Sequence, residues 1–251
     1  MTIRKEGYQF VQDICVPCYQ TDAAFFLKPA AFMDLAQEIA FWAAQMLGFG
    51  YDDLSVHRTA WVLSRFHIRF GAHLPRWRDE VTLRTWHKGL SGLFFLRDFR
   101  LLDATGAPCI TATSSWVIID TDTRRLVRPE RLQHLLQTQD AVESAISEPA
   151  PKIVFPETDA AELALTHTVA YSDVDILGHT NNARYMVWAM DALPYDLTAA
   201  RRVREVFIQF NKETTPGTAV ELYRFQENED CWWVDVRADG RSACCLKIVF
   251  A

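Results

Sequence analysis

Hydrophobic and polar residues alternate in short segments that occur in both halves of the chain. Alternation with a period of two is typical of strands that pack one face against a core and expose the other. Turn sequences separate several of the segments, for example Asp103-Ala-Thr-Gly106. The predicted strands are residues 61–70, 80–86, 94–102 and 107–119 in the first half, and 204–210, 219–225, 231–236 and 242–250 in the second.

A long hydrophobic stretch precedes each set of strands, at residues 30–48 and 182–193. The second stretch carries only two charged residues, Arg184 and Asp191, which lie seven positions apart and therefore on one face of a helix. Pro194 is expected to end it. Helices that are apolar around most of their circumference must be enclosed, and a curved antiparallel sheet can enclose them.

The two halves also begin alike. Asp175 lies 153 residues after Asp22, and Tyr185 lies 153 residues after Phe32. The order strand, helix and four strands, given twice, predicts a duplicated α+β unit with antiparallel sheet. Between the halves, residues 137–159 hold three prolines and little periodicity, so we interpret them as a linker. The expected division is 1–136, linker 137–159, and 160–251.

Composition narrows the function classes. The chain has 251 residues and a formal net charge of −6, which argues against general nucleic-acid binding. The first residues lack the apolar core of a signal peptide and include an early acid, so we expect neither a signal nor a transit peptide. Acidic residues interrupt the longest apolar stretch, which argues against a membrane span. The six cysteines include one C-x-x-C, Cys15-Val-Pro-Cys18, and no second pair at a zinc-like spacing, so we expect reduced thiols in a cytoplasmic protein.

The most distinctive motif is D-x-x-G-H-x-N-N-x-x-Y, from Asp175 to Tyr185, at the junction of a strand and a buried helix. This pattern resembles the hot-dog thioesterases. Further motifs of the chain are similar to the acyl-ACP thioesterases of plants and bacteria: Gln37-Glu38, Trp61-Val-Leu-Ser-Arg65, Thr85-Trp86, Arg97-Asp98-Phe99, Thr113-Ser-Ser-Trp116 and Arg124-Arg125. The resemblance extends from about Val16 to the C-terminus. It implies a tandem (double) hot-dog fold, hydrolysis of fatty acyl-ACP to free fatty acid in fatty acid biosynthesis, and no metal or organic cofactor.

Thioester hydrolysis needs a nucleophile, or a base for water, and a donor for the carbonyl oxygen. The carboxylate of Asp175 could activate water or attack the carbonyl directly, and the sequence leaves these two roles open. The resemblance implies that His179 is the catalytic histidine and that Glu213 is a base or the partner of His179. Backbone N–H groups near Gly178 and His179 are the expected donors to the oxyanion.

The neighbours of these residues refine the hypothesis. Asn181 and Asn182 stand where a helix cap belongs, and we interpret Asn182 as the N-cap, with either residue able to support the loop. Tyr185 is expected to pack rather than react. Leu177 replaces an asparagine of the plant enzymes, so an amide donor is missing. Thr214 replaces a cysteine, which favours carboxylate-driven hydrolysis over a Cys-His pair.

The first half repeats the scaffold without the chemistry. Phe26 stands opposite His179, His73 lies opposite Glu213, and only Asp22 keeps its carboxylate. We therefore expect the first half to hold the acyl chain and the second half to carry the catalysis. The aromatic residues expected to line an acyl tunnel are Phe25, Phe26, Phe32, Phe41 and Trp42.

Arginine clusters suggest a face that binds anions, because guanidinium groups pair well with phosphate and carboxylate. Arg124, Arg125 and Arg128 are the candidate docking bases for an acidic acyl carrier protein. Coenzyme A phosphates would also suit them, so an acyl-CoA thioesterase is one alternative. A non-catalytic acyl-binding protein is another, although three ionisable groups in an apolar cleft argue against a pure binder. The sequence leaves the oligomeric state open, a homodimer included.

Overall fold

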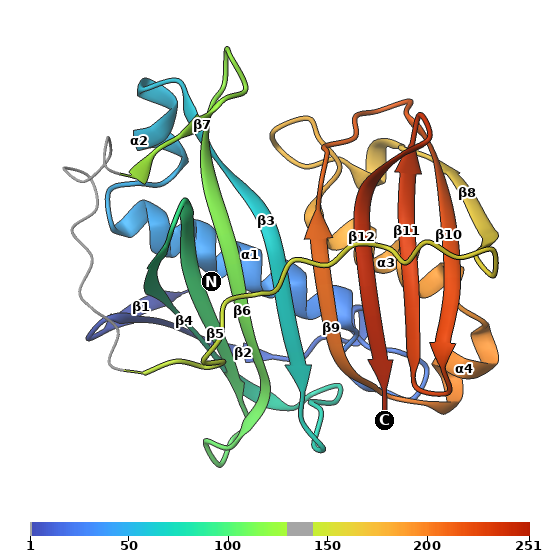
Figure 1. Ribbon diagram of the computed structural model, residues 1–251. Helices are drawn as coiled ribbons and strands as arrows, with labels where there is room; N and C mark the ends of the chain where they lie inside the picture. The colour runs from blue at the N-terminus through green and yellow to red at the C-terminus, as the bar shows by residue number, and fades with distance from the viewer. Residues whose placement is uncertain (1, 130–142) are drawn as a thin grey trace.

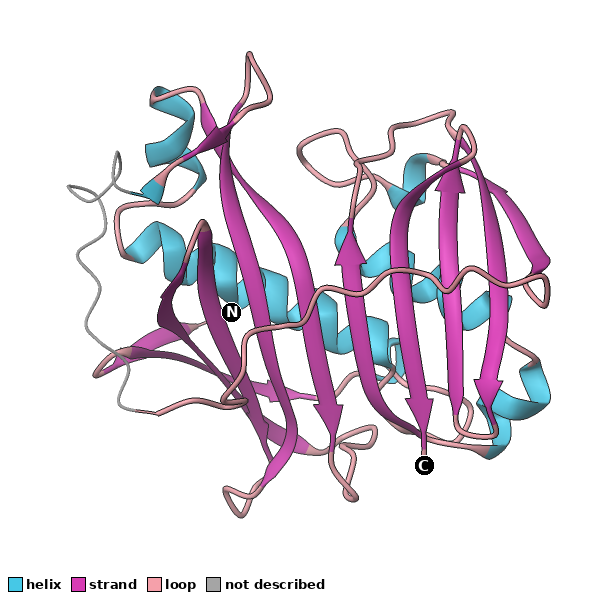
Figure 2. Ribbon diagram, viewed as in Figure 1, coloured by secondary structure: helices cyan, strands magenta, loops and turns pink. Residues whose placement is uncertain are grey.

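One antiparallel sheet runs through both halves of the protein and curves around two long helices (Figures 1 and 2). The computed structural model describes residues 2–129 and 143–251. Within this part, the order strand, helix and four strands occurs twice. The duplicated α+β architecture expected from the sequence is therefore confirmed.

The N-terminal half contributes the strand order β1-β2-β4-β5-β6-β3, with β7 paired to β6. The C-terminal half contributes β9-β12-β11-β10-β8, which is the same order turned around, since β9 follows its helix as β3 does. The strands are β1 (Ile3–Glu6), β2 (Gln9–Cys15), β3 (Thr59–Phe70), β4 (Glu80–Ser91), β5 (Phe94–Leu102), β6 (Pro108–Asp120), β7 (Leu126–Val127), β8 (Glu162–Thr168), β9 (Val203–Phe210), β10 (Ala219–Asn228), β11 (Cys231–Ala238) and β12 (Arg241–Phe250).

The two halves meet along a continuous backbone ladder. Strands β3 and β9 pair in antiparallel register from Arg65 opposite Gln209 to Arg69 opposite Glu205. The N–H and C=O groups at the seam thus bond to each other in the same way as elsewhere in the sheet. As a result, the halves form one sheet rather than two packed domains.

Helix α1 (Pro29–Met46) and helix α3 (Asn182–Ala192) lie on the same side of the sheet and contact each other. Both are buried over most of their surface, as their composition requires. Phe32 and Ile39 of α1 and Met186 of α3 are fully buried in the main core. Two short helices, α2 (Tyr51–Val56) and α4 (Tyr195–Ala200), follow the long ones, and the sequence patterns did not predict them.

The connection between the halves is packed against the sheet rather than free. Its described part, residues 143–159, has no helix or strand and crosses the outer face of the sheet (Figure 1). The N–H of Ala145 donates to Asp98 Oδ2 at 2.7 Å, and Trp86 Nε1 donates to the carbonyl oxygen of Glu143 at 3.1 Å. Phe155 packs against a cluster that contains Trp233. The first part of the expected linker, residues 137–142, lies outside the described residues.

The predicted strands are confirmed, with ends that shift by a few residues. Both predicted long helices are present, and α3 ends two residues before Pro194. In the described part of the chain, no helix has the length and apolar character needed to cross a membrane.

Candidate active site

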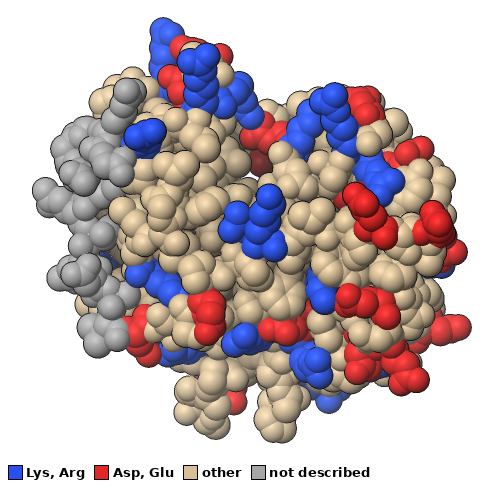
Figure 3. Space-filling model, in the orientation of Figure 1, with Lys and Arg blue, Asp and Glu red and all other residues tan. Residues whose placement is uncertain are grey.

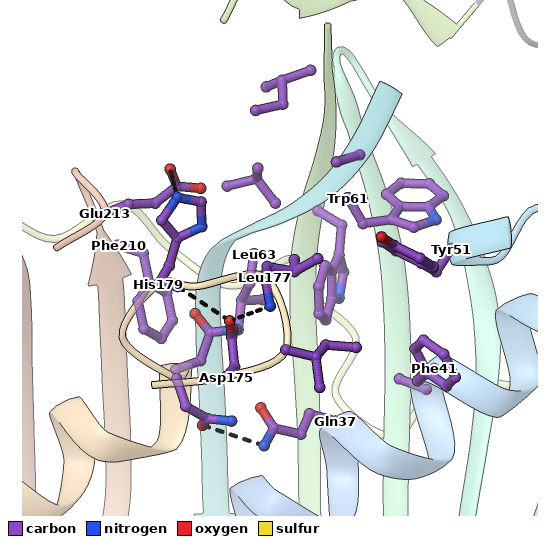
Figure 4. A pocket seen from close by; sticks show the side chains of 18 of the residues that line it. Gln37, Phe41, Tyr51, Trp61, Leu63, Asp175, Leu177, His179, Phe210 and Glu213 are labelled. Carbon is purple, nitrogen blue, oxygen red and sulfur yellow. Dashed lines mark hydrogen bonds and ion pairs between the residues drawn. The ribbon is translucent and has the colours of Figure 1, made fainter. Parts of the chain in front are cut away.

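A cavity of about 1230 Å³ lies where the two halves meet. One side is formed by the loop before α3 and by the residues that follow β9, and it carries Asp175, His179 and Glu213. The other side is formed by α1, α2 and strands of the N-terminal half. Phe41, Tyr51 and Trp61 lie on this apolar side, across the cavity from His179 and Glu213 (Figure 4).

Asp175 closes a tight turn with its own side chain. Its Oδ1 accepts hydrogen bonds from the N–H of Leu177 at 2.9 Å and of His179 at 3.3 Å. The backbone closes the same turn, because Asp175 N–H donates to His179 O and Gly178 N–H donates to Asp175 O. Gly178 has a φ of +79°, a conformation that glycine adopts at little cost. Asp175 Oδ2 has no hydrogen-bond partner in the described part of the chain, so it is the oxygen left for water or substrate.

These hydrogen bonds correct the expected oxyanion donors. The N–H groups of Gly178 and His179 both donate within the turn, to the carbonyl and the carboxylate of Asp175. They are therefore not free to stabilise a developing oxyanion in this conformation. Gly178 is exposed and does not line the cavity, so it supports the turn rather than contacting the substrate.

The helix cap lies one residue earlier than predicted. Asn181 is the N-cap of α3, and its Oδ1 accepts from Ala183 N–H at 2.8 Å. The same oxygen accepts from Gln37 Nε2 of α1 at 3.2 Å, which ties the two helices together beside the cavity. Asn182 is the first residue of α3 and lines the cavity. Both asparagines thus lie at the site, and Asn181 is the one with a defined structural role.

His179 and Glu213 face each other at the mouth of the cavity. The imidazole points toward Glu213, with Nε2 of His179 3.6 Å from Oε2 of the carboxylate (Figure 4). Both side chains are about 30% exposed, so water reaches them. This separation exceeds a hydrogen bond and is within the range of an ion pair. The structure therefore brings the predicted histidine and glutamate together.

Buried hydroxyl groups hold Glu213 close to the loop before α3. Thr214, the next residue, is buried, and its Oγ1 bonds to Thr180 Oγ1 at 2.7 Å and to Tyr185 Oη at 2.9 Å. The N–H of Thr180 donates to Thr214 O at 2.9 Å. Burial raises the pKa of Tyr185 to about 12, so its hydroxyl stays protonated. Tyr185 and Thr214 thus act through packing and hydrogen bonds.

A buried carboxylate anchors the start of the same loop. Asp173 is almost fully buried and accepts from His167 Nε2 at 2.7 Å, from Arg184 Nε at 3.0 Å and from Ala170 N–H at 2.9 Å. Burial alone would raise the pKa of Asp173, but these hydrogen bonds outweigh it and lower the pKa. The carboxylate therefore stays ionised and fixes the segment that leads into the turn closed by Asp175.

The first half contributes a polar pair as well as apolar surface. Arg97 and His87 are paired neighbours on β5 and β4, and both line the cavity. Arg97 is only 6% exposed, and no acidic partner of its guanidinium is found among the described residues. Burial lowers the pKa of Arg97 to about 10, so it remains charged at neutral pH. Burial, with a smaller effect from the charge of Arg97, lowers the pKa of His87 to about 4. Of the aromatic residues expected to line an acyl tunnel, Phe41 lines the cavity.

Two contacts at the site were missed by sequence reasoning. Arg124, which stays a predicted docking base, ion-pairs with Glu213 from across the mouth of the cavity. Gln37 donates a hydrogen bond to Asn181. The sequence indicates that Gln37 needs some partner, because a polar residue on an enclosed apolar helix must be hydrogen-bonded. No local pattern in the sequence links Arg124 to Glu213.

Two family models match the chain. Residues 7–132 match the model of the acyl-ACP thioesterase N-terminal domain, and residues 157–250 match that of the acyl-ACP thioesterase C-terminal domain. Among curated relatives, the chain is 26% identical over 239 residues to oleoyl-acyl carrier protein thioesterase 2, chloroplastic, of Arabidopsis thaliana. That alignment covers 87% of this chain and 63% of the relative. Palmitoyl-acyl carrier protein thioesterase, chloroplastic, of Cuphea hookeriana is 24% identical over 235 residues, covering 88% of this chain and 55% of the relative. The chain thus spans less than two thirds of the length of these relatives.

Solved structures show the fold. An acyl-ACP thioesterase from Bacteroides thetaiotaomicron superimposes with a TM-score of 0.87 at 24% identity, covering 97% of this chain and 98% of that one. The 12:0-ACP thioesterase from Umbellularia californica gives a TM-score of 0.86 at 20% identity, covering 99% of each chain. The double hot-dog fold expected from the sequence is confirmed.

Proposed function

Because the chain belongs to the acyl-ACP thioesterase family, we propose that it hydrolyses the thioester of fatty acyl-ACP and releases a free fatty acid and ACP. The observation that carries this proposal is the cavity itself. It joins Asp175, His179 and Glu213 at one side to an aromatic and aliphatic surface on the other. A substrate with a reactive polar end and a long apolar tail suits such a cavity.

Asp175 is the residue we place at the scissile bond. Its Oδ1 is held by two backbone N–H groups, which fixes the carboxylate and leaves Oδ2 available. As a general base, Oδ2 would take a proton from water while the water oxygen bonds to the thioester carbon. As a nucleophile, it would form an anhydride that water then cleaves. In both routes the C–S bond breaks and the thiolate of the carrier takes up a proton.

His179 and Glu213 supply the second part of the chemistry. An imidazole facing a carboxylate can hold a proton and pass it to the leaving sulfur. The residue after Glu213 is Thr214 rather than a cysteine. Its buried hydroxyl bonds to the hydroxyl groups of two other residues. This arrangement supports hydrolysis driven by carboxylates rather than by a Cys-His pair.

The acyl carrier protein is the proposed partner. Basic side chains gather on the β6–β7 hairpin, beside the hollow between the two halves (Figure 3). Arg125 on this hairpin and Arg128, which follows β7, are exposed and suit an acidic carrier. Coenzyme A phosphates could use the same bases, so an acyl-CoA thioesterase is the second candidate. A cytoplasmic location stays a prediction from the sequence.

A panel of thioesters tests the function directly. Purified protein is assayed with acyl-ACP and acyl-CoA substrates of the same chain lengths, and thiol release is measured. We expect a higher kcat/KM for acyl-ACP. Faster hydrolysis of acyl-CoA at every length would replace ACP with CoA as the carrier. Binding without release of thiol would favour the non-catalytic acyl-binding alternative.

Charge reversal tests the docking face. In the double variant Arg125→Glu/Arg128→Glu, we expect a raised KM for acyl-ACP and little change for a short acyl-pantetheine thioester, which lacks the carrier. Equal effects on the two substrates would remove docking from the account. The experiment separates recognition of the carrier from the chemistry of the thioester.

A further inference from the structure

Arg124 reaches from the N-terminal half to a proposed catalytic residue of the C-terminal half. It lies in the hairpin between β6 and β7, and its guanidinium ion-pairs with Oε2 of Glu213. The same oxygen lies 3.6 Å from Nε2 of His179. Glu213 Oε2 therefore sits between a permanent cation and the imidazole. The ion pair also bridges the two halves of the molecule at the mouth of the cavity.

The hairpin holds Arg124 in an uncommon backbone conformation. Its φ is +58°, in the left-handed region that non-glycine residues rarely occupy. Asp120 fixes the turn, because its Oδ1 accepts from the N–H groups of Asp122 and Thr123 and its carbonyl accepts from Arg124 N–H. Glycine or asparagine would fit this position with less strain.

We propose that Arg124 is a positioning residue of the thioesterase reaction, which holds the Glu213 carboxylate against His179 and so completes the active site from the N-terminal half. This inference rests on the proposed function. Glu213 is 31% exposed, so without a partner its carboxylate can turn toward water. The ion pair with the Arg124 guanidinium limits that motion and keeps the negative charge beside the imidazole. Other charged residues lining this part of the cavity are Asp175 and Lys212.

The kinetic test compares Arg124→Gln, Arg124→Lys and a matched control. Arg58→Gln is the control, since Arg58 is an exposed arginine at positive φ whose ion pair with Asp122 lies on the same hairpin. We expect Arg124→Gln to lower kcat about 10-fold with little change in KM, the scale of coupling within one ion-pair network. Arg124→Lys should have a kcat between those of Arg124→Gln and the unchanged protein, because lysine keeps the positive charge but lacks the planar guanidinium group. Arg58→Gln should behave as the unchanged protein.

A double variant shows whether the effect passes through the glutamate. Adding Arg124→Gln to Glu213→Gln should lower kcat no further than Glu213→Gln alone. Additive losses would overturn the proposal. A raised KM for acyl-ACP at unchanged kcat in Arg124→Gln would also overturn it, and would return Arg124 to carrier docking.

A spectroscopic test separates this proposal from the proposed function. The imidazole ¹⁵N resonances of His179, assigned with His179→Gln, are measured without substrate. We expect them to move in Arg124→Gln and to stay in place in Arg58→Gln. Unchanged resonances in Arg124→Gln would overturn the positioning role. If the unchanged protein cleaved no thioester while these shifts appeared, the proposed function would fail and the contact between the two halves would stand.

Discussion

Asp22 and Asp175 close the same hydrogen-bonded turn in the two halves of the protein. Asp22 Oδ1 accepts from the N–H groups of Ala24 and Phe26, two and four residues later, at 2.8 and 2.9 Å. Asp175 Oδ1 accepts from the N–H groups at the same two offsets. The carboxylate of Asp175, which we place at the thioester, therefore also has the structural role of closing the turn. Asp22 has this structural role in the first half. In the first half, the other oxygen of Asp22 ion-pairs with Arg202 at 2.9 Å, so that turn has no free oxygen.

This pair of turns permits a controlled test of Asp175. An asparagine keeps Oδ1 as acceptor for both backbone N–H groups, so Asp175→Asn should fold normally while losing the charge. We expect its kcat to fall at least about 100-fold, the scale of lost acid–base catalysis. Steady-state hydrolysis of acyl-ACP measures the effect, and thermal unfolding checks the fold.

Asp22→Asn is the matched control. It makes the same chemical change in the equivalent turn and removes only a partly exposed ion pair with Arg202, which contributes about 1 kcal/mol or less. Turnover should stay close to that of the unchanged protein. Near-native turnover in Asp175→Asn, or equal losses in the two variants, would contradict the catalytic assignment.

The hydroxyl cluster behind Glu213 yields a stability prediction. Thr214→Val removes the partner of Tyr185 and Thr180 while keeping the shape of the side chain. A buried polar group that loses its partner costs about 1–3 kcal/mol, so the free energy of unfolding should fall by that amount. Urea denaturation measures it. Thr214→Ser, which keeps the hydroxyl, should lose less, and equal losses would assign the effect to packing.

The buried His87 should make the free energy of unfolding depend on pH. Burial lowers its pKa from 6.5 to about 4 in the folded protein. Between these values the unfolded chain binds the proton and the folded chain does not, so the free energy of unfolding falls as the pH falls from about 6.5 to about 4. Urea denaturation at several pH values should show a smaller loss in His87→Gln. Burial also lowers the pKa of His67. His67 therefore changes the free energy of unfolding in the same direction in the unchanged protein and in His87→Gln. Identical pH profiles would contradict the assignment to His87.

The buried guanidinium of Arg97 is expected to reduce stability. A buried charge without a counterion is costly, and apolar side chains of similar volume often stabilise a protein when they replace buried ionic groups. Arg97→Met should therefore raise the free energy of unfolding, by an amount on the order of 1–3 kcal/mol. Urea denaturation at neutral pH is the measurement. A less stable variant would show that the contact with Thr85, at 3.3 Å, outweighs the cost of burial.

Local patterns were enough to predict most of the scaffold. Period-two alternation gave β5 at its observed bounds, and the two enclosed helices followed from their apolar circumference. The offset between Asp22 and Asp175 indicated a duplication, and the structure shows that the two residues close turns with equivalent hydrogen bonds. These features depend on residues close in the chain, where periodicity and turn chemistry carry the information.

The details of the site depend on contacts between distant residues. The contact of Arg124 with Glu213 spans 89 positions and that of Gln37 with Asn181 spans 144, and no spacing rule anticipates either. The N-cap at Asn181 instead of Asn182 turned on one residue, a usual margin for helix ends. The sequence predicts free N–H groups near Gly178. In the structure, the carbonyl and side-chain oxygens of Asp175 accept hydrogen bonds from them, and no sequence pattern indicates these bonds.

The ladder between β3 and β9 changes how this protein responds to dilution. Where two separate subunits share such a seam, mass action links their stability to concentration. Here both edges of the seam belong to one chain, so its closure is a unimolecular event. Closure of the seam should therefore be independent of protein concentration, and the site at the junction should stay assembled in dilute solution.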